Sequence, residues 1–163
     1  MELAASDVVA ISAGAYPAVA SYYLLLPHGG SLGRGFGPVL VARKPVGLAV
    51  SDFRQYTPGD GIPVTQPTTA YLSYDNKNLY VGWICKDDPA KIRARVARRK
   101  DLESDDRVTI NIDTFHDHKR AYWFDVNPYA IQYDGVTTDG QGDDTSWETL
   151  WRTEAKITAD GYV

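Results

Sequence analysis

The chain has 163 residues, of which 44% are hydrophobic and 23% charged, and its formal net charge is −4. This length suits one domain, and the composition is that of a folded globular protein rather than a disordered one. The negative charge argues against a dedicated nucleic-acid-binding protein, for which a strongly basic surface is expected. The single cysteine, Cys85, excludes an intrachain disulfide and a multi-cysteine metal site.

Residues 1–46 differ from the rest of the chain, because they contain only two acidic residues. The apolar run at 18–26 is too short to span a bilayer, which takes about 20 apolar residues. No lysine or arginine precedes it, so a convincing secretion signal is missing. The glycine-rich stretch at 29–37 is typical of a flexible linker. We therefore predict a poorly structured lead-in or linker over 1–46 and a folded domain over 47–163.

Beyond residue 47 the sequence has the period of β-strands, in which successive side chains point to opposite faces. The clearest case is the stretch that contains Val108, Ile110 and Ile112, which share one face. Runs of this kind, separated by turn residues, predict strands at 69–74, 79–85, 107–113, 121–126, 131–133 and 154–157.

Two segments depart from the strand pattern. Asp88 and Pro89 predict a short helix, since aspartate caps a first turn and proline suits its first position. The basic run that follows, at 91–100, is balanced by acids just after it and is expected to be a solvated, salt-bridged surface. Residues 137–145 are expected to form a loop. Together these patterns predict an all-β fold, an antiparallel β-sandwich with one short helix.

Several short motifs follow one another in a characteristic order. They are Asp52-Phe53-Arg54-Gln55, Asn78-Leu79-Tyr80-Val81, Asp106-Arg107-Val108, Phe124-Asp125-Val126-Asn127-Pro128 and Ser146-Trp147. On these motifs, residues 47–163 resemble the family 9 carbohydrate-binding modules, and in detail the amino-terminal module of larger bacterial proteins with a β-rich, outer-membrane-associated region. The resemblance implies a β-sandwich, a glycan partner and an extracytoplasmic location. It also implies a role in carbohydrate catabolism beside an attached glycoside hydrolase, without catalysis by this chain.

The resemblance is incomplete in two places. The family continues past a Gly-Tyr pair like Gly161-Tyr162, so we expect a sandwich that is truncated at its C-terminus and needs a missing C-terminal region or a partner domain. Of the family's sugar clamp only Asn127 is kept. The remaining candidates for sugar contact are Trp123, Trp147 and Trp151, whose flat rings suit the C–H faces of sugars. Packing in the core is the alternative for each tryptophan.

Acidic residues and histidines gather near the predicted turns. Asp106, Asp113 and Asp117 are candidate ligands for a structural calcium ion, which prefers carboxylate oxygens; capping and solubility are their alternative roles. His116 and His118 could hold a metal ion together, but solvated turn histidines are expected, because three or four convergent ligands are required. No pair of acids is singled out for glycoside hydrolysis, so no catalytic residue is assigned.

Two other functions stay open at this point. One is a structural or interaction module of an outer-membrane-associated protein that has lost sugar binding. The other is a haem-binding sandwich domain, although haem needs axial ligands and Met1 is the single methionine. Neither a nucleic-acid partner nor a membrane span in this chain is expected.

Overall fold

The protein is described by a computed structural model over residues 8–14, 20–25, 48–55, 61–74, 78–102 and 104–163. Within these ranges every regular element is a β-strand and every strand pairing is antiparallel, so the predicted all-β class is confirmed. The same ranges contain no helix long and apolar enough to cross a membrane. The glycine-rich stretch at 29–37 and the predicted domain boundary at residue 46 lie outside them, and the division into two domains stays a prediction.

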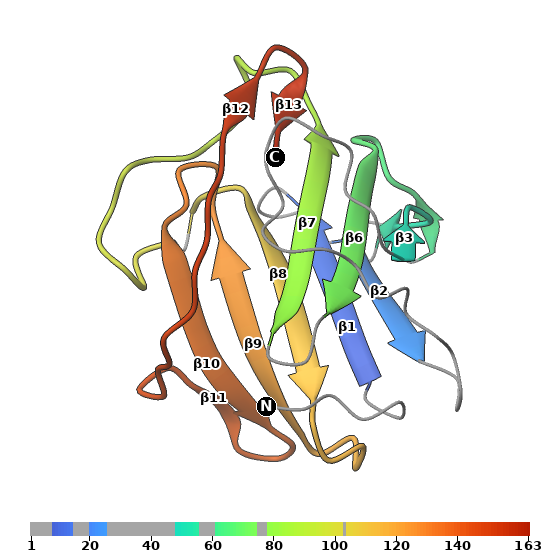
Figure 1. The fold of residues 1–163 in the computed structure, drawn as a ribbon, viewed down its shortest axis with the longest axis vertical. Helices are drawn as coiled ribbons and strands as arrows, with labels where there is room; N and C mark the ends of the chain where they lie inside the picture. The colour runs from blue at the N-terminus through green and yellow to red at the C-terminus, as the bar shows by residue number, and fades with distance from the viewer. Residues whose placement is uncertain (1–7, 15–19, 26–47, 56–60, 75–77, 103) are drawn as a thin grey trace.

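The larger sheet, which we call sheet A, has eight strands in the order β11-β10-β9-β8-β1-β2-β4-β5 (Figure 1). Their bounds are β1 Val8–Gly14, β2 Ala20–Leu25, β4 Arg54–Gln55, β5 Ile62–Pro63, β8 Arg107–Asp113, β9 Arg120–Val126, β10 Gln132–Thr138 and β11 Gly142–Asp144. Strand β1 pairs with β8 along its whole length. The early part of the chain thus contributes backbone to the middle of the sheet.

The smaller sheet, sheet B, has five strands in the order β12-β13-β7-β6-β3. Their bounds are β3 Leu48–Val50, β6 Thr68–Tyr74, β7 Leu79–Lys86, β12 Ile157–Thr158 and β13 Gly161–Tyr162. Strands β6 and β7 lie in front of sheet A in Figure 1. They form the hairpin that the alternating residues at 69–74 and 79–85 predict.

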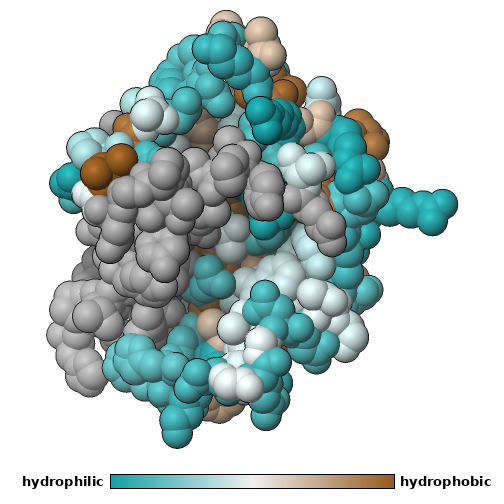
Figure 2. All heavy atoms as spheres, turned by 180° about the vertical axis from the view of Figure 1, so that it is seen from behind, coloured by the Kyte–Doolittle hydropathy of each residue, from teal (hydrophilic) through white to brown (hydrophobic). Residues whose placement is uncertain are grey.

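A hydrophobic cluster joins the two sheets. It combines residues of β3, of the segment after β3, of β6 and of β8, and its buried members are Val50, Phe53, Ala70, Leu72, Ile110 and Ile112. Each fully buried aliphatic or phenyl side chain contributes about 1.5–3 kcal/mol relative to its exposed state. On the face opposite to the view of Figure 1, the described surface is mostly hydrophilic, with hydrophobic side chains in small separate patches (Figure 2).

A second cluster lies at the other end of β7 and contains Cys85, Val108 and Tyr162. Burial raises the pKa of the Cys85 thiol to about 11, against hydrogen bonds to Tyr162 and Thr68. The thiol is therefore protonated and inert, as expected of a cysteine that serves as a small hydrophobic residue.

The predicted helix after Asp88 is absent: residues 89–91 form a turn, 92–98 have no regular secondary structure, and 99–100 form a second turn. The backbone N–H of Arg93 donates to the Asp106 carboxylate at 2.9 Å. The N–H of Arg95 donates to Asp105 at 3.3 Å. These amides find acceptors on side chains that come later in the chain, instead of on the carbonyls of a preceding helical turn. The helix prediction was wrong because local capping signals do not report such distant acceptors.

The predicted loop at 137–145 is also wrong, since β10 extends into it and β11 returns as the second strand of a hairpin. Gly140 and Gly142, with φ of 71° and 81°, make the reversal. Conversely, the strand predicted at 154–157 begins only at Ile157, although Lys156 before it exchanges backbone hydrogen bonds with Val163 at 2.8 and 3.0 Å.

Candidate functional site

Residues 145–156, which we call the strap, run from β11 to β12 across the front of sheet A (Figure 1). Two tryptophans hold the strap against β9. The ring centroid of Trp147 lies 4.9 Å from that of Tyr122 and 6.1 Å from that of Phe124. The ring of Trp151 meets Phe124 edge-on at 5.4 Å. The strap therefore covers the aromatic face of β9.

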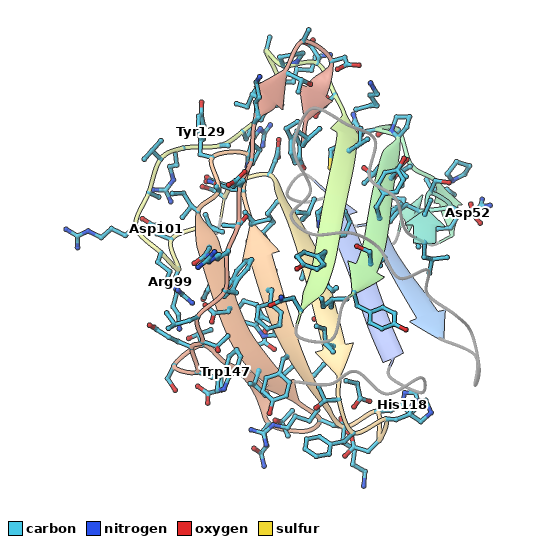
Figure 3. The ribbon with its side chains drawn as sticks, in the orientation of Figure 1. Asp52, Arg99, Asp101, His118, Tyr129 and Trp147 are labelled. Carbon is cyan, nitrogen blue, oxygen red and sulfur yellow. The ribbon has the colours of Figure 1, made fainter. Side chains whose placement is uncertain are left out.

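Residues 91–100, which we call the basic arm, are tied to the strap by their last two side chains. The Nη2 atom of Arg99 donates to the Thr149 carbonyl at 2.8 Å. The Nζ atom of Lys100 donates to the Trp147 carbonyl at 2.9 Å. The predicted solvated surface is thus partly a structural clamp, and Figure 3 shows Arg99 beside β10.

A buried ion pair fixes this junction. Asp134 is fully buried, and its Oδ1 atom accepts from Arg99 Nη2 at 2.6 Å. Its Oδ2 atom accepts from the backbone N–H of Thr149 at 2.9 Å. Arg99 also donates to the side-chain oxygen of Gln132 at 3.2 Å. A buried carboxylate with a cation and an amide as donors is well compensated, so the arm, β10 and the strap are held in one geometry.

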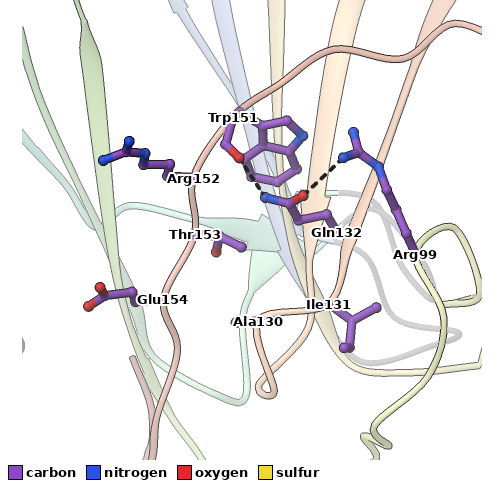
Figure 4. A pocket seen from close by; sticks show the side chains of 8 residues that line it. All are labelled: Arg99, Ala130, Ile131, Gln132, Trp151, Arg152, Thr153 and Glu154. Carbon is purple, nitrogen blue, oxygen red and sulfur yellow. Dashed lines mark hydrogen bonds between the residues drawn. The ribbon is translucent and has the colours of Figure 1, made fainter.

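A pocket of about 460 Å³ lies between the basic arm, the turn before β10 and the strap. We call it the strap pocket, and its lining consists of Arg99, Ala130, Ile131, Gln132, Trp151, Arg152, Thr153 and Glu154 (Figure 4). The side-chain amide of Gln132 donates to the Trp151 carbonyl at 3.0 Å and stands between Trp151 and Arg99. Its volume lies within the range of about 300–1,000 Å³ typical of small-molecule pockets, and it is largely open to solvent.

The strap pocket is rich in hydrogen-bond donors. The Nε atom of Arg99 and the Nε1 atom of Trp151 are buried and have no hydrogen-bond partner. Arg152 is exposed at the pocket wall and forms no ion pair with any residue that the structure describes. Glu154, the one acid in the lining, lies on the same side of the strap as Arg152 (Figure 4). The arrangement suits a ligand with oxygen acceptors.

Two of the four predicted sugar-contact residues are not accessible. Trp123 is 8% exposed, and its ring meets that of Tyr133 edge-on at 5.0 Å. It also fills the space above Gly135, where an added Cβ would lie 2.3 Å from the Trp123 ring. Trp123 therefore packs on the face of sheet A opposite to the strap, while Trp147 and Trp151 share Phe124 on the other face.

Asn127 is 1% exposed and structural. Its Nδ2 atom donates to the Arg95 carbonyl at 2.9 Å and to Asp105 at 2.8 Å. Its Oδ1 atom accepts from the backbone N–H groups of Tyr129 and Ile131, both at 2.9 Å. Both donor hydrogens and both acceptor positions of the amide are thus used inside the protein.

The three predicted calcium ligands bind backbone amides in the structure. Asp106 accepts from Arg93, Asp113 from two amides of the turn at 114–119, and Asp117 from the amide two residues on. Strand β8 separates Asp106 from Asp113, so the three are not brought together. Among the residues with described positions, no group of three or more His, Cys, Asp or Glu side chains could hold a metal ion. Calcium binding stays a prediction.

The sequence reasoning missed Arg99, Gln132 and Asp134. The predicted strand at 131–133 ends before Asp134 and Gly135, whereas both lie in the middle of β10. Gln132 and Asp134 are two residues apart, so a strand at this point places both side chains on one face. An acid buried on that face requires a cation from elsewhere in the chain, and this was the available signal. A basic run of the required charge stands at 91–100.

A second buried acid, Asp125, makes the folded protein less stable as the pH rises, which is the opposite of the usual effect of a carboxylate. Its Oδ2 atom is 3.2 Å from Arg107 Nε, and its Oδ1 atom has no partner. Burial raises the pKa of Asp125 to about 6, against the hydrogen bond from Thr109 and the charge of Arg107. The unfolded value is about 3.9. The folded state therefore holds this proton to higher pH, and the contribution of Asp125 to stability falls as the pH rises from about 4 to about 6.

We expect Asp125→Asn to remove this dependence. Relative to the variant, the native chain should lose about 2–3 kcal/mol of unfolding free energy between pH of about 4 and about 7. Urea denaturation followed by circular dichroism across this range measures the difference. The exposed Asp139 provides a matched control as Asp139→Asn, which should run parallel to the native chain. Parallel curves for Asp125→Asn and the native chain would contradict the assignment.

Comparison with known protein families gives one match. Residues 2–57 match the model of a family described as menaquinone biosynthesis. The matched stretch contains β1 to β4 and is about a third of the chain. No curated protein and no solved structure matches the chain.

This match overturns the functional predictions made from the sequence. The resemblance to family 9 carbohydrate-binding modules is not borne out, so the predicted carbohydrate binding and role in carbohydrate catabolism are wrong. The glycan partner, the interaction module and the haem-binding domain find no support either. The burial of Trp123 and Asn127 gives a physical reason, because neither can reach a sugar. Over residues 2–57 the chain is similar to a family of menaquinone biosynthesis.

Proposed function

We propose that this protein takes part in menaquinone biosynthesis by binding a flat, carboxylate-bearing ring compound in the strap pocket. The pathway rests on the family match over residues 2–57. The ligand class rests on the residues that line the pocket. Menaquinone itself is built on two fused flat rings, so a compound on the way to it has the shape that a pocket of about 460 Å³ accommodates.

The observation that carries the proposal is the position of Arg152. Arg152 belongs to the lining and has no ion-pair partner in the described part of the chain. Its side chain lies on the same side of the strap as Glu154, across the strap from Trp151 and Gln132 (Figure 4). Arginine binds a carboxylate through two parallel hydrogen bonds, which are about twice as strong as bonds between neutral groups. Trp151, on the other side of the strap, adds an aromatic ring to the pocket lining.

The two unpartnered donors support the same ligand class. A buried N–H group without an acceptor costs about 1–3 kcal/mol, and the pocket lining contains two such groups, on Arg99 and Trp151. Both atoms are covered in the structure, so an oxygen of the ligand reaches them only when the strap moves away from β9. Binding then supplies the acceptors that the free protein lacks.

The matched residues and the pocket belong to one sheet. Strand β1 pairs with β8, β8 with β9, and β9 with β10, whose first residue is Gln132 in the pocket lining. The sheet that the matched stretch helps to form is therefore the sheet that carries the pocket. A hydrophobic cluster joins sheets A and B, and we infer that the two sheets stack as a β-sandwich.

Calorimetric titration of the full chain with naphthoate and with its uncharged amide, naphthamide, tests the ligand class. We expect saturable binding of naphthoate and at least about tenfold weaker binding of naphthamide, since a hydrogen bond to a charged group contributes about 1.5–3 kcal/mol. Arg152→Gln should weaken naphthoate binding about tenfold and leave naphthamide unchanged. Glu154→Gln should strengthen naphthoate binding, because it removes a like charge.

Arg98 provides the matched control, since it is exposed, carries the same charge and does not line the pocket. Arg98→Gln should bind naphthoate as the native chain does. Equal binding of acid and amide, or an unchanged affinity in Arg152→Gln, would contradict the proposed ligand class. The pathway has its own test, because cells that lose this chain should contain less menaquinone. An unchanged menaquinone content would overturn the pathway and leave the ligand class standing.

A further inference from the structure

The turn between β8 and β9 brings two histidines together at the end of sheet A, where Figure 3 labels His118. The ring centroids of His116 and His118 lie 5.2 Å apart, with an interplanar angle of 56°. Both residues have positive φ, 52° and 56°. Side chains rarely adopt this conformation, although histidine does so more often than most. The two imidazoles thus lie next to each other in a turn with two left-handed residues.

The backbone of this turn is fixed by Asp113, the last residue of β8. The Asp113 carboxylate is buried and accepts from the backbone N–H of Phe115 at 3.0 Å and of His118 at 2.9 Å. Burial acts to raise the pKa of Asp113, but the N–H donors of the turn outweigh it and hold the pKa below its usual value. The carboxylate thus stays ionised and anchors the turn without using either imidazole.

The spacing of the two rings fits joint coordination of one metal ion. A transition metal binds an imidazole nitrogen at about 2.0–2.1 Å, and the ring centre lies about 1.1 Å behind that nitrogen. Two imidazoles that meet an ion at the tetrahedral angle of about 109° therefore have centroids about 5 Å apart. The centroids of His116 and His118 are 5.2 Å apart, which matches this spacing.

We propose that His116 and His118 bind a late first-row divalent metal ion of the class of Zn²⁺, Ni²⁺ or Cu²⁺, with water in the remaining positions. Imidazole is a preferred ligand of these ions. Both side chains are exposed and can be reached from solvent. Asp117, between them in the sequence, places a negative charge in the same turn, while the cation of Arg120 lies over the Tyr122 ring at 5.9 Å.

Titration of the full chain with Cu²⁺, followed by electron paramagnetic resonance, tests the site. Nitrogen hyperfine structure from two imidazoles is expected in the native chain, and calorimetry with Zn²⁺ should show one saturable site. His116→Asn and His118→Asn should each weaken binding at least about tenfold, because each leaves a single imidazole. Asparagine is the chosen replacement since it tolerates the left-handed conformation.

The third histidine, His28, supplies the control. His28→Asn should bind Cu²⁺ and Zn²⁺ as the native chain does, and the double variant of His116 and His118 should show no saturable site. Circular dichroism should confirm that every variant is folded. Absence of nitrogen hyperfine structure in the native chain, or equal binding by the folded double variant, would overturn the proposal. Naphthoate binding should be the same in all of these variants, which separates this site from the strap pocket.

Discussion

Arg99→Met is expected to destabilise the folded protein by about 3–5 kcal/mol, the usual effect of removing one partner of a buried ion pair. Asp134 is fully buried and 2.6 Å from the Arg99 guanidinium, so the variant leaves an uncompensated carboxylate in the core. Methionine keeps much of the apolar stem of arginine, and loss of packing is therefore small. Urea denaturation followed by circular dichroism measures the change.

Two comparison variants make this result specific. Arg54→Met breaks an ion pair with Asp52 in which both side chains are at least half exposed, and it should cost less than about 1 kcal/mol. Adding Asp134→Asn to Arg99→Met removes the stranded charge and should recover much of the lost stability. An effect of Arg99→Met no larger than that of Arg54→Met would show that the buried pair does not hold the arm and strap.

Gly161→Ala is expected to destabilise the fold by about 4 kcal/mol or more. Gly161 has a φ of +139°, and an added Cβ would lie 1.9 Å from the carbonyl oxygen of Cys85 and 2.9 Å from the backbone nitrogen of Asp87. Strand β13 pairs with β7 at this residue, so the clash falls on backbone that cannot move without breaking the pairing. The cluster of Cys85, Val108 and Tyr162 should open as β13 detaches.

The reactivity of Cys85 reports this opening directly. The thiol is buried and its pKa is raised to about 11, so a thiol-specific reagent should label the native chain very slowly and Gly161→Ala quickly. Gly140→Ala is the matched control, since Gly140 also has a positive φ, +71°, but its added Cβ would meet nothing within 4 Å. It should cost only about 1 kcal/mol. Similar stability and labelling rates for the two variants would contradict a steric role of Gly161.

The strands could be predicted wherever alternation is strict. Val108, Ile110 and Ile112 share a buried face as their spacing indicates, and β6 and β7 form the expected hairpin. The prediction failed where distant side chains decide the backbone. The carboxylates of Asp106 and Asp105 accept from the backbone amides of Arg93 and Arg95, and no local sequence pattern predicts these contacts.

The candidate site was less accessible to prediction for the same physical reason. Trp147 and Trp151 were candidates for sugar contact, with packing in the core as the alternative; both rings contact Phe124. Arg99 meets Gln132 and Asp134 only through the fold, because 33 and 35 positions separate them in the sequence. Trp123 was predicted to contact sugar because of its residue type alone. Its burial against Gly135 depends on the register of β9 and β10, which places the two residues opposite each other.

Binding in the strap pocket is tested most directly by nuclear magnetic resonance of the side-chain N–H groups during titration with naphthoate. The Nε1–H of Trp151 and the Nε–H of Arg99 lack partners in the free protein and should shift strongly once a ligand oxygen accepts from them. The Nε1–H of Trp123 is also unpartnered but lies on the opposite face of sheet A, so it should stay in place. Unmoved signals from Trp151 and Arg99, or a shift of Trp123 instead, would contradict ligand binding between the basic arm and the strap.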